Sequence, residues 1–263
     1  PANLKYLFHP SYNISPSDLR KSILTLAVQG KLVNRIVSDG SGSEILEKAF
    51  VAEVSLDDVP DVPSHWVWAR IGSICTRMDS GWSPACISEP SGKNKWGVLK
   101  TTAVQTLQYH EEQNKALPPN LDPRPEHEVS DGDILITRAG PMNRVGILCV
   151  ARPTRTKLMI SDKIVRFHLV AGIDPDFAAL SMNAGYSRDF IDGLKSGMAE
   201  SQVNISQPKL RSVPIPIPPL AEQRRIVAKV SQLMTLVDEL ETDLTTTRTT
   251  AQNLLSALVA ELT

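Results

Sequence analysis

The chain has 263 residues with 41% hydrophobic and 22% charged side chains, an ordinary globular composition with enough length for one large domain or two modest ones. No apolar run approaches the length of a membrane span and the first residues lack a signal-peptide pattern, which disfavours a membrane or secreted protein. Three scattered cysteines without metal or redox spacing favour a reducing cytoplasm, and the net charge of −1 taken alone argues against a nucleic-acid binder.

The first element expected in chain order is a helix that begins at Ser15. Ser15 suits the N-cap position and Asp18 the acidic position of a capping box. Apolar residues at helical spacing continue to Gly30, which predicts the C-terminal stop. Ser43 is expected to cap a second, short helix. A linker rich in proline and acidic residues follows, so we expect residues 1–62 to form an N-terminal helical segment and linker.

Residues 63–212 have a different pattern of short apolar runs bounded by turns, which is typical of strands. The expected strands are 97–99, 133–137, 145–150 and 164–170. The other expected elements are turns at 131–133 and 139–141, helices near 176–183 and 188–194, and an ordered loop at 196–207. The expected fold class is therefore α+β, with one mixed α/β domain flanked by an N-terminal helical segment and a long C-terminal coiled-coil helix.

The middle of the chain also concentrates positive charge. Residues 138–166 carry seven arginines and lysines against one acid, Asp162. Such a segment is a candidate surface for contact with phosphates. Charge alone leaves open the alternative of a solvated loop or strand face.

Residues 213–263 begin with alternating prolines, which cannot lie in a helix or a central strand and therefore predict a stiff extended segment. Pro219 suits the first position of a helix that continues to the end of the chain. Glu222 then lies in the first turn, where the helix dipole favours an anion.

This last helix carries apolar residues at alternating spacings of four and three, a 3.5-residue period that is typical of a left-handed coiled coil. The seam comprises Ile226, Val230, Leu233, Val237, Leu240, Leu244, Leu254 and Leu258, with weaker positions at Thr247 and Ala251. A helix from Leu220 to Leu262 would be about 65 Å long. It must pack against another helix, in this chain or in a partner.

Motifs for catalysis are not found in the sequence. It contains no Walker A loop, no dinucleotide-binding glycine fingerprint and no Asn-Pro-Pro-aromatic signature of adenine methyltransferases. The five histidines have no metal-binding spacing. We therefore expect a non-catalytic chain with no metal site and no cofactor of its own.

Several segments together resemble the specificity subunits of type I restriction-modification systems. The most specific is PIPIPPLAEQRRIV at 214–227, followed by LVDELE at 236–241. The helix and its end at 19–33, the segment PSHWVWARIG at 63–72 and the short runs at 132–135 and 204–206 agree with that family. The resemblance covers the chain from about Leu19 to its end, but with one recognition domain and one long helix where a typical member has two of each.

The resemblance implies a half-length specificity subunit, or a fragment of a longer one, that binds double-stranded DNA at one half of a bipartite site. It would direct a modification (methyltransferase) subunit and a restriction (motor and nuclease) subunit, in which S-adenosylmethionine, ATP and Mg²⁺ are bound. A homodimer through the long helix would present two recognition domains. Two alternatives remain: a coiled-coil scaffold or adaptor, and the recognition half of a split restriction-modification enzyme.

Under this interpretation, residues 63–212 form the DNA-binding, target-recognition domain. Candidates for base contact are Arg138, Asn143, Arg144, Gln202 and Asn204. Candidates for phosphate contact are Lys93, Lys95, Lys100, Arg155, Lys157 and Lys163. Each could instead be a solvated side chain, and Arg152 and Arg166 could be structural residues of a sheet.

Overall fold

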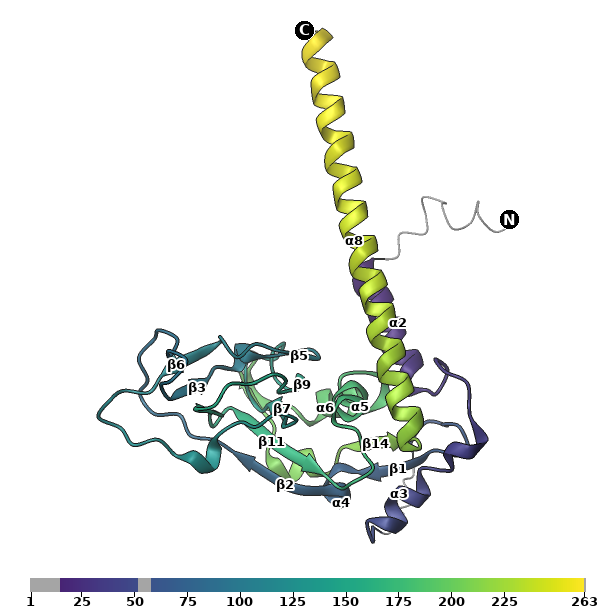
Figure 1. The fold of residues 1–263 in the computed structure, drawn as a ribbon, viewed down its shortest axis with the longest axis vertical. Helices are drawn as coiled ribbons and strands as arrows, with labels where there is room; N and C mark the ends of the chain where they lie inside the picture. Colours follow the sequence, from purple (N-terminus) through teal and green to yellow (C-terminus); the bar gives the residue numbers. More distant parts are fainter. Residues whose placement is uncertain (1–14, 52–57, 263) are drawn as a thin grey trace.

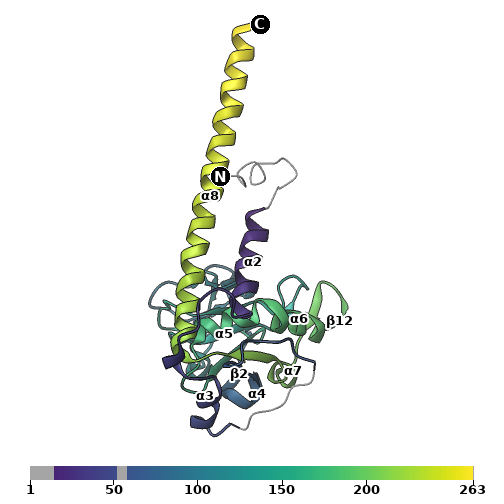
Figure 2. The ribbon, with the colours of Figure 1, turned by 90° about the vertical axis from the view of Figure 1, so that its right-hand side faces the viewer.

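The computed structural model describes residues 15–51 and 58–262, and it confirms the expected α+β fold with a long C-terminal helix. Helix α8 (Leu220–Leu262) rises from one end of a mixed α/β domain, so that the two together form an L in Figure 1. Helix α2 (Pro16–Val28) lies beside the lower part of α8 in both Figure 1 and Figure 2.

The N-terminal segment begins with α2, as its sequence signals predict. The Ser15 hydroxyl accepts a hydrogen bond from the Asp18 amide at 3.1 Å, and Gly30 ends the helix in the left-handed region at φ 68°. A 3-10 turn η1 (Val37–Asp39) and helix α3 (Ser43–Lys48) follow. Ser43 was expected to cap α3, but it is the first helical residue and the cap position is Gly42, which has no side chain to offer. Part of the expected linker, 52–57, lies outside the described residues.

The centre of the domain is an antiparallel four-stranded sheet in the order β2-β11-β7-β9. Its strands are β2 (Cys75–Ser80), β11 (Ile164–Leu169), β7 (Ile134–Thr137) and β9 (Leu148–Val150). The expected strands near 133, 145 and 164 are thus confirmed within a few residues. Side chains alternate between the faces of the sheet, so Ile134 and Ile136 belong to one apolar cluster and Leu135 to another.

Each face of this sheet is covered by other elements. On one face lie the expected helices, α5 (Pro175–Met182) and α6 (Gly185–Leu194). On the other lies the sheet β10-β3-β6, made of β10 (Leu158–Met159), β3 (Gly97–Leu99) and β6 (Asn114–Ala116). The short elements nearby are α4 (Ile71–Ile74), η2 (Thr101–Ala103), β4 (Val104–Gln105), β5 (Gln108–Tyr109), η3 (Pro125–His127) and α7 (Gln207–Arg211).

Two sequence interpretations of irregular segments are wrong. Ala139–Gly140 was expected to be a turn but is strand β8, and the expected loop at 196–207 contains the hairpin of β12 (Ser196–Ala199) and β13 (Gln202–Asn204). The order in this sheet is β12-β13-β8. All four residues of β12 are exposed, so backbone pairing forms the hairpin without the alternating apolar pattern that reveals strands in sequences.

The alternating prolines form strand β14 (Pro214–Ile217), which pairs antiparallel with β1 (Val67–Arg70) in a two-stranded sheet. This confirms the extended conformation, and a strand with a single partner can hold prolines at alternate positions because one side needs no N–H donors. Pro219 was expected to be the first helical residue, but α8 begins at Leu220. The Pro219 carbonyl instead accepts from the amides of Glu222 and Gln223.

The apolar seam of α8 divides into two parts. Ile226 and Val230 are buried against α2 and α5, with Phe177 and Leu24 in the same cluster, and Val237 is 5% exposed. Farther along, the side chains of Leu240, Leu244 and Leu254 are 55%, 65% and 61% exposed. The first half of the seam therefore packs within this chain, whereas its distal leucines do not. Leu258 belongs to α8, but its side chain lies outside the described residues.

Candidate functional site

Three segments of the domain meet in a continuous polar strip, which comprises residues 101–113, 141–146 and 196–204. The Arg144 guanidinium donates to the carbonyl oxygens of Thr101 at 2.9 Å and Val104 at 3.0 Å, and joins the second segment to the first. The Met142 amide donates to the Glu200 carbonyl at 2.7 Å and joins it to the third. Residues far apart in the sequence thus share one surface.

The predicted base-contacting residues lie in or beside this strip. Asn143, Gln202 and Asn204 are exposed there. Arg144 is half-buried and its guanidinium is held by the internal hydrogen bonds described above. Arg138 is half-buried just before β8, and its backbone bonds to Lys163 and Ile205. The structure therefore brings these five residues to one region, although it places Arg144 as a support of its neighbours.

Four of the predicted phosphate-contacting residues gather around the loop at 91–95. The Arg155 guanidinium donates to the carbonyl oxygens of Lys93 at 3.4 Å and Lys95 at 3.2 Å, and the Lys157 ammonium donates to that of Asn94 at 3.2 Å. This basic cluster adjoins the polar strip, because the Arg155 amide donates to the Glu111 carboxylate at 2.7 Å. Lys100 lies next to the strip through a backbone bond with Gln113. Lys163 is exposed, and its carbonyl accepts from the Arg138 amide at 2.8 Å, so it lies beside Arg138 rather than in the basic cluster.

The positive segment 138–166 does not form one surface, because its cations have different environments. Arg166 is 2% exposed at the centre of β11, and Arg152 pairs with Asp176 at 2.8 Å. Arg166 is thus a structural residue of the sheet, as was considered for it, whereas Arg152 follows the end of β9 and is exposed. The charge of this segment therefore overstates the number of cations available to a ligand.

Arg166 is the centre of a buried ionic network. Its guanidinium contacts the carboxylates of Asp79 at 2.7 Å and Asp133 at 3.3 Å, and Asp133 also contacts His168. Burial alone would raise the pKa of Asp79, but its hydrogen bonds and attraction to Arg166 outweigh this effect and hold the pKa below its ordinary value. The network joins β2, β11 and the start of β7, and so fixes the sheet that carries the polar strip.

A second buried network attaches the domain to α8. The Glu222 carboxylate is 1% exposed and contacts His65 Nε2 at 2.7 Å and Trp66 Nε1 at 3.1 Å. The Gln223 amide donates to the carbonyl oxygens of Pro218 and Gly172 and accepts from the Asp174 amide. Glu222 was interpreted as a partner of the helix dipole, but these contacts assign it a larger role in setting the direction of α8.

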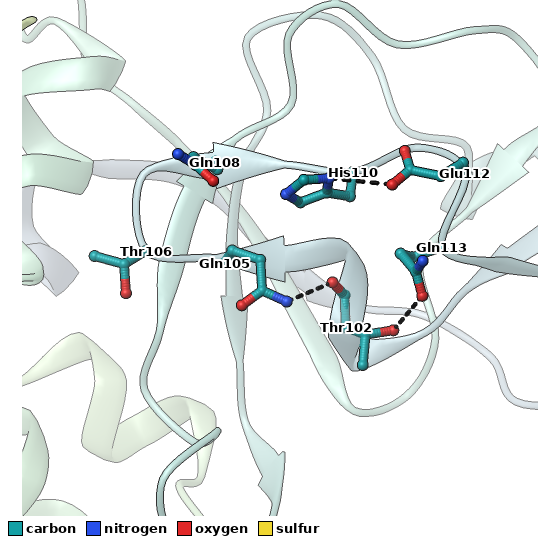
Figure 3. A pocket seen from close by; sticks show the side chains of 7 residues that line it. All are labelled: Thr102, Gln105, Thr106, Gln108, His110, Glu112 and Gln113. Atoms are coloured by element: carbon teal, nitrogen blue, oxygen red, sulfur yellow. Dashed lines mark hydrogen bonds and ion pairs between the residues drawn. The ribbon is translucent and has the colours of Figure 1, made fainter. Parts of the chain in front are cut away.

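The β4–β5 hairpin and the residues after it form a polar part of the strip that was not predicted from the sequence (Figure 3). A shallow hollow of about 730 Å³ is lined only by polar residues, namely Thr102, Gln105, Thr106, Gln108, His110, Glu112 and Gln113. The available signal was three glutamines within nine residues, beside threonines and a histidine. The lining contains no lysine or arginine, so a pattern of positive charge does not mark it.

Within residues 15–51 and 58–262, no group of three His, Cys, Asp or Glu side chains is arranged to hold a metal ion. Over the same ranges, no helix is both long and apolar enough to cross a membrane.

Comparison with known proteins identifies the family. Residues 131–247 match the type I restriction modification DNA specificity domain. The type I restriction enzyme EcoEI specificity subunit of Escherichia coli is 46% identical over 260 residues, covering 91% of this chain and 44% of that protein. The EcoAI specificity subunit, also of Escherichia coli, is 28% identical over 298 residues, covering 93% and 44%. The chain thus spans less than half the length of these curated relatives.

A solved structure agrees on the fold. The HsdS subunit from Thermoanaerobacter tengcongensis superposes with a TM-score of 0.50 at 19% identity, over 87% of this chain and 47% of that one. The likeness at this identity concerns the fold alone. Together with the domain match and the 46% identity to a specificity subunit, it places the chain in the family of type I restriction-modification specificity subunits.

Proposed function

We propose that this chain is a sequence-specific DNA-binding specificity subunit of a type I restriction-modification complex, and that it recognises one half of a bipartite site. The observation that carries this proposal is the 46% identity to a specificity subunit across 91% of the chain. The polar strip supports it, because exposed amide side chains at 143, 202 and 204 can read base edges. The basic cluster beside the strip can contact phosphates, which position a protein on DNA without specifying sequence.

The partners in this proposal are double-stranded DNA, a modification (methyltransferase) subunit and a restriction subunit, all acting in the cytoplasm. S-adenosylmethionine, ATP and Mg²⁺ would be bound by those subunits, while this chain supplies the recognition surface and carries out no chemistry. The exposed amides of the polar strip and the cations of the basic cluster suit such a recognition role.

Salt dependence of binding tests the phosphate contacts. Lys95→Ala and Lys163→Ala are each expected to lower the slope of log affinity against log salt by about one, equally on all DNA sequences, because one phosphate contact is lost. The measurement is a fluorescence-anisotropy titration at several salt concentrations. Lys48→Ala is the matched control, since Lys48 is an exposed lysine on α3, remote from the strip.

Unchanged slopes for both variants would remove these lysines from the interface. No detectable DNA binding by the wild-type chain, alone or with its modification subunit, would contradict the proposed function and favour the scaffold alternative.

The distal half of α8 supports a homodimer. The exposed leucines Leu240, Leu244 and Leu254 continue the seam that α2 and α5 cover nearer the domain. A second copy of α8, running antiparallel, would bury them and place a second recognition domain at the other end. A helix of 43 residues is about 65 Å long, near two turns of B-DNA, and would set the gap between half-sites.

Charge placed on the seam tests this dimer. The double variant Leu244→Glu/Leu254→Glu is expected to be monomeric at concentrations where the wild type is dimeric, because four glutamates would face one another in the paired seam. Light scattering after size-exclusion chromatography gives the mass. Thr246→Glu/Asn253→Glu adds the same charge to exposed positions outside the seam and should stay dimeric. A wild-type monomer at all concentrations, or equal masses for the two variants, would contradict the dimer.

A further inference from the structure

We propose that the β4–β5 hairpin enters the major groove of the target DNA and that Gln108 reads an adenine there, with Arg144 acting as a positioning residue. The inference rests on the proposed function and assigns a specificity-determining side chain to it. A two-stranded β-ribbon fits the major groove. A glutamine amide can form a bidentate pair with adenine there, in which its NH2 group donates to N7 and its oxygen accepts from the N6 amino group.

Gln108 is the available amide of the hairpin. Its side chain is exposed and makes no hydrogen bond to the residues that the structure describes. Gln105, its cross-strand partner, is different: its amide accepts from Arg144 at 2.7 Å and donates to the Thr102 carbonyl at 2.8 Å. One glutamine is thus fixed in the protein, and the other is left to find a partner outside it (Figure 3).

The hairpin is held rigidly at its turn. Leu107 has φ 59°, a left-handed conformation that is unusual for a bulky residue and persists only where the surroundings enforce it. Its side chain packs against the core, and its amide donates to the Leu148 carbonyl at 3.0 Å. Because Leu107 points inward, its neighbours Thr106 and Gln108 are left exposed at the tip. A reading side chain on a rigid support loses less conformational entropy when it binds.

The β4–β5 hairpin also faces the space between the domain and α8, which is where the proposal requires the DNA to lie. A hollow of about 770 Å³ lies between the domain and α8. Its polar lining comes from Thr106, Gln108 and His110 on one side and from Ser231, Thr235 and Asp238 of α8 on the other, and the rest of its lining is largely apolar. The hairpin therefore lies in the inner corner of the L (Figure 1), where a duplex running beside the spacer helix would pass. Its neutral tip is continuous with the basic cluster through Glu111 and Arg155.

Arg144 holds the β4–β5 hairpin in place through its hydrogen bonds. Its three hydrogen bonds all end on residues 101–105, so they fix β4 and thereby the turn that carries Gln108. Three of the five N–H donors of Arg144 are committed to these oxygens, and Nε is buried, which leaves one Nη1 hydrogen and not the two donors that a bidentate contact with guanine needs. We therefore expect Arg144 to affect base preference indirectly, by fixing the position of Gln108.

Selection of binding sites from a randomised duplex, with the chain assembled with its modification subunit, tests the proposal. Gln108→Ala is expected to relax preference at one position by about 5- to 150-fold, while nonspecific affinity and the salt slope stay unchanged. Gln108→Glu should shift that position toward cytosine, whose amino group a carboxylate accepts from. Gln232→Ala, an exposed glutamine on α8, is the matched control and should select the wild-type sequence.

Arg144→Ala separates positioning from reading. It should relax the same position as Gln108→Ala, and the double variant should lose little more, because the two residues act through one contact. Relaxation at a different position would overturn the positioning role. If the wild type selects a defined sequence and Gln108→Ala selects the same one, the hairpin assignment is overturned while the proposed function stands. If the wild type selects no sequence, both fail.

Discussion

Replacing Arg166 with alanine is expected to lower the free energy of unfolding by about 3–5 kcal/mol, measured by urea denaturation. Arg166 is 2% exposed and neutralises Asp79 and Asp133, of which Asp133 is 1% exposed. Removing the cation leaves the buried Asp133 carboxylate with only His168 and the Ser130 amide as partners, and the lost compensation of its charge is the main cost. Arg166→Lys keeps the charge but not the paired geometry of the guanidinium, so it should lose less.

The pH dependence of unfolding gives a second readout of the same network. The folded-state pKa of Asp79 lies below its ordinary value, so the pairing stabilises the fold above that ordinary value, about pH 4 for an aspartate. This stability is lost as the pH falls through the lowered pKa. Wild type and Arg166→Ala should therefore approach each other in strong acid. A loss below about 1 kcal/mol at neutral pH would contradict the role given to Arg166.

Replacing Glu222 with alanine is expected to cost about 3 kcal/mol of unfolding free energy. The change leaves His65 Nε2 and Trp66 Nε1 without their acceptor in a site from which water is excluded. Trp66 also packs edge-to-face on Phe177, with their ring centroids 6.2 Å apart, in the cluster that includes Ile226 of α8. We therefore expect the substitution to weaken the packing between the domain and α8.

Two variants serve as controls for Glu222. Glu222→Gln keeps an amide oxygen as acceptor and should be the milder change. Glu239→Ala removes an exposed carboxylate from the same helix and should alter stability by no more than about 0.5 kcal/mol. If Glu222→Ala were as stable as Glu239→Ala, the contacts at the base of α8 would not hold the domain in place.

Local signals in the sequence predicted the elements whose own residues decide their conformation. The cap at Ser15 and the stop at Gly30 bound α2, and the apolar run 133–137 gives β7. The long helix follows from its repeat, and its proximal seam is buried as a coiled-coil pattern requires. The sequence could not say which helix covers that seam, because α2 and a partner's helix satisfy the same pattern.

Elements that depend on distant pairing escaped prediction. Strand β8 exists because Gly140 pairs with Val203, and the β12 residues show no apolar alternation. The roles of residues in the candidate site also depend on contacts between segments that are distant in the sequence. Charge marked Arg144 and Arg155 as ligands of DNA, but the carbonyl groups that occupy their guanidinium groups come from segments about 40 and 60 residues away. Gln108 is uncharged, and what distinguishes it is that its neighbours Gln105 and Arg144 are fixed by hydrogen bonds whereas its own side chain is exposed.

Sequencing of methylated bases in host DNA tests the central claim of DNA specificity most directly. The chain would be expressed with the modification subunit of its own system in a host that lacks both. We expect methylation at one defined bipartite sequence, and Gln108→Ala should broaden that sequence at a single position of each half that this chain reads. Methylation with no common sequence, or the same pattern with and without this chain, would contradict the account.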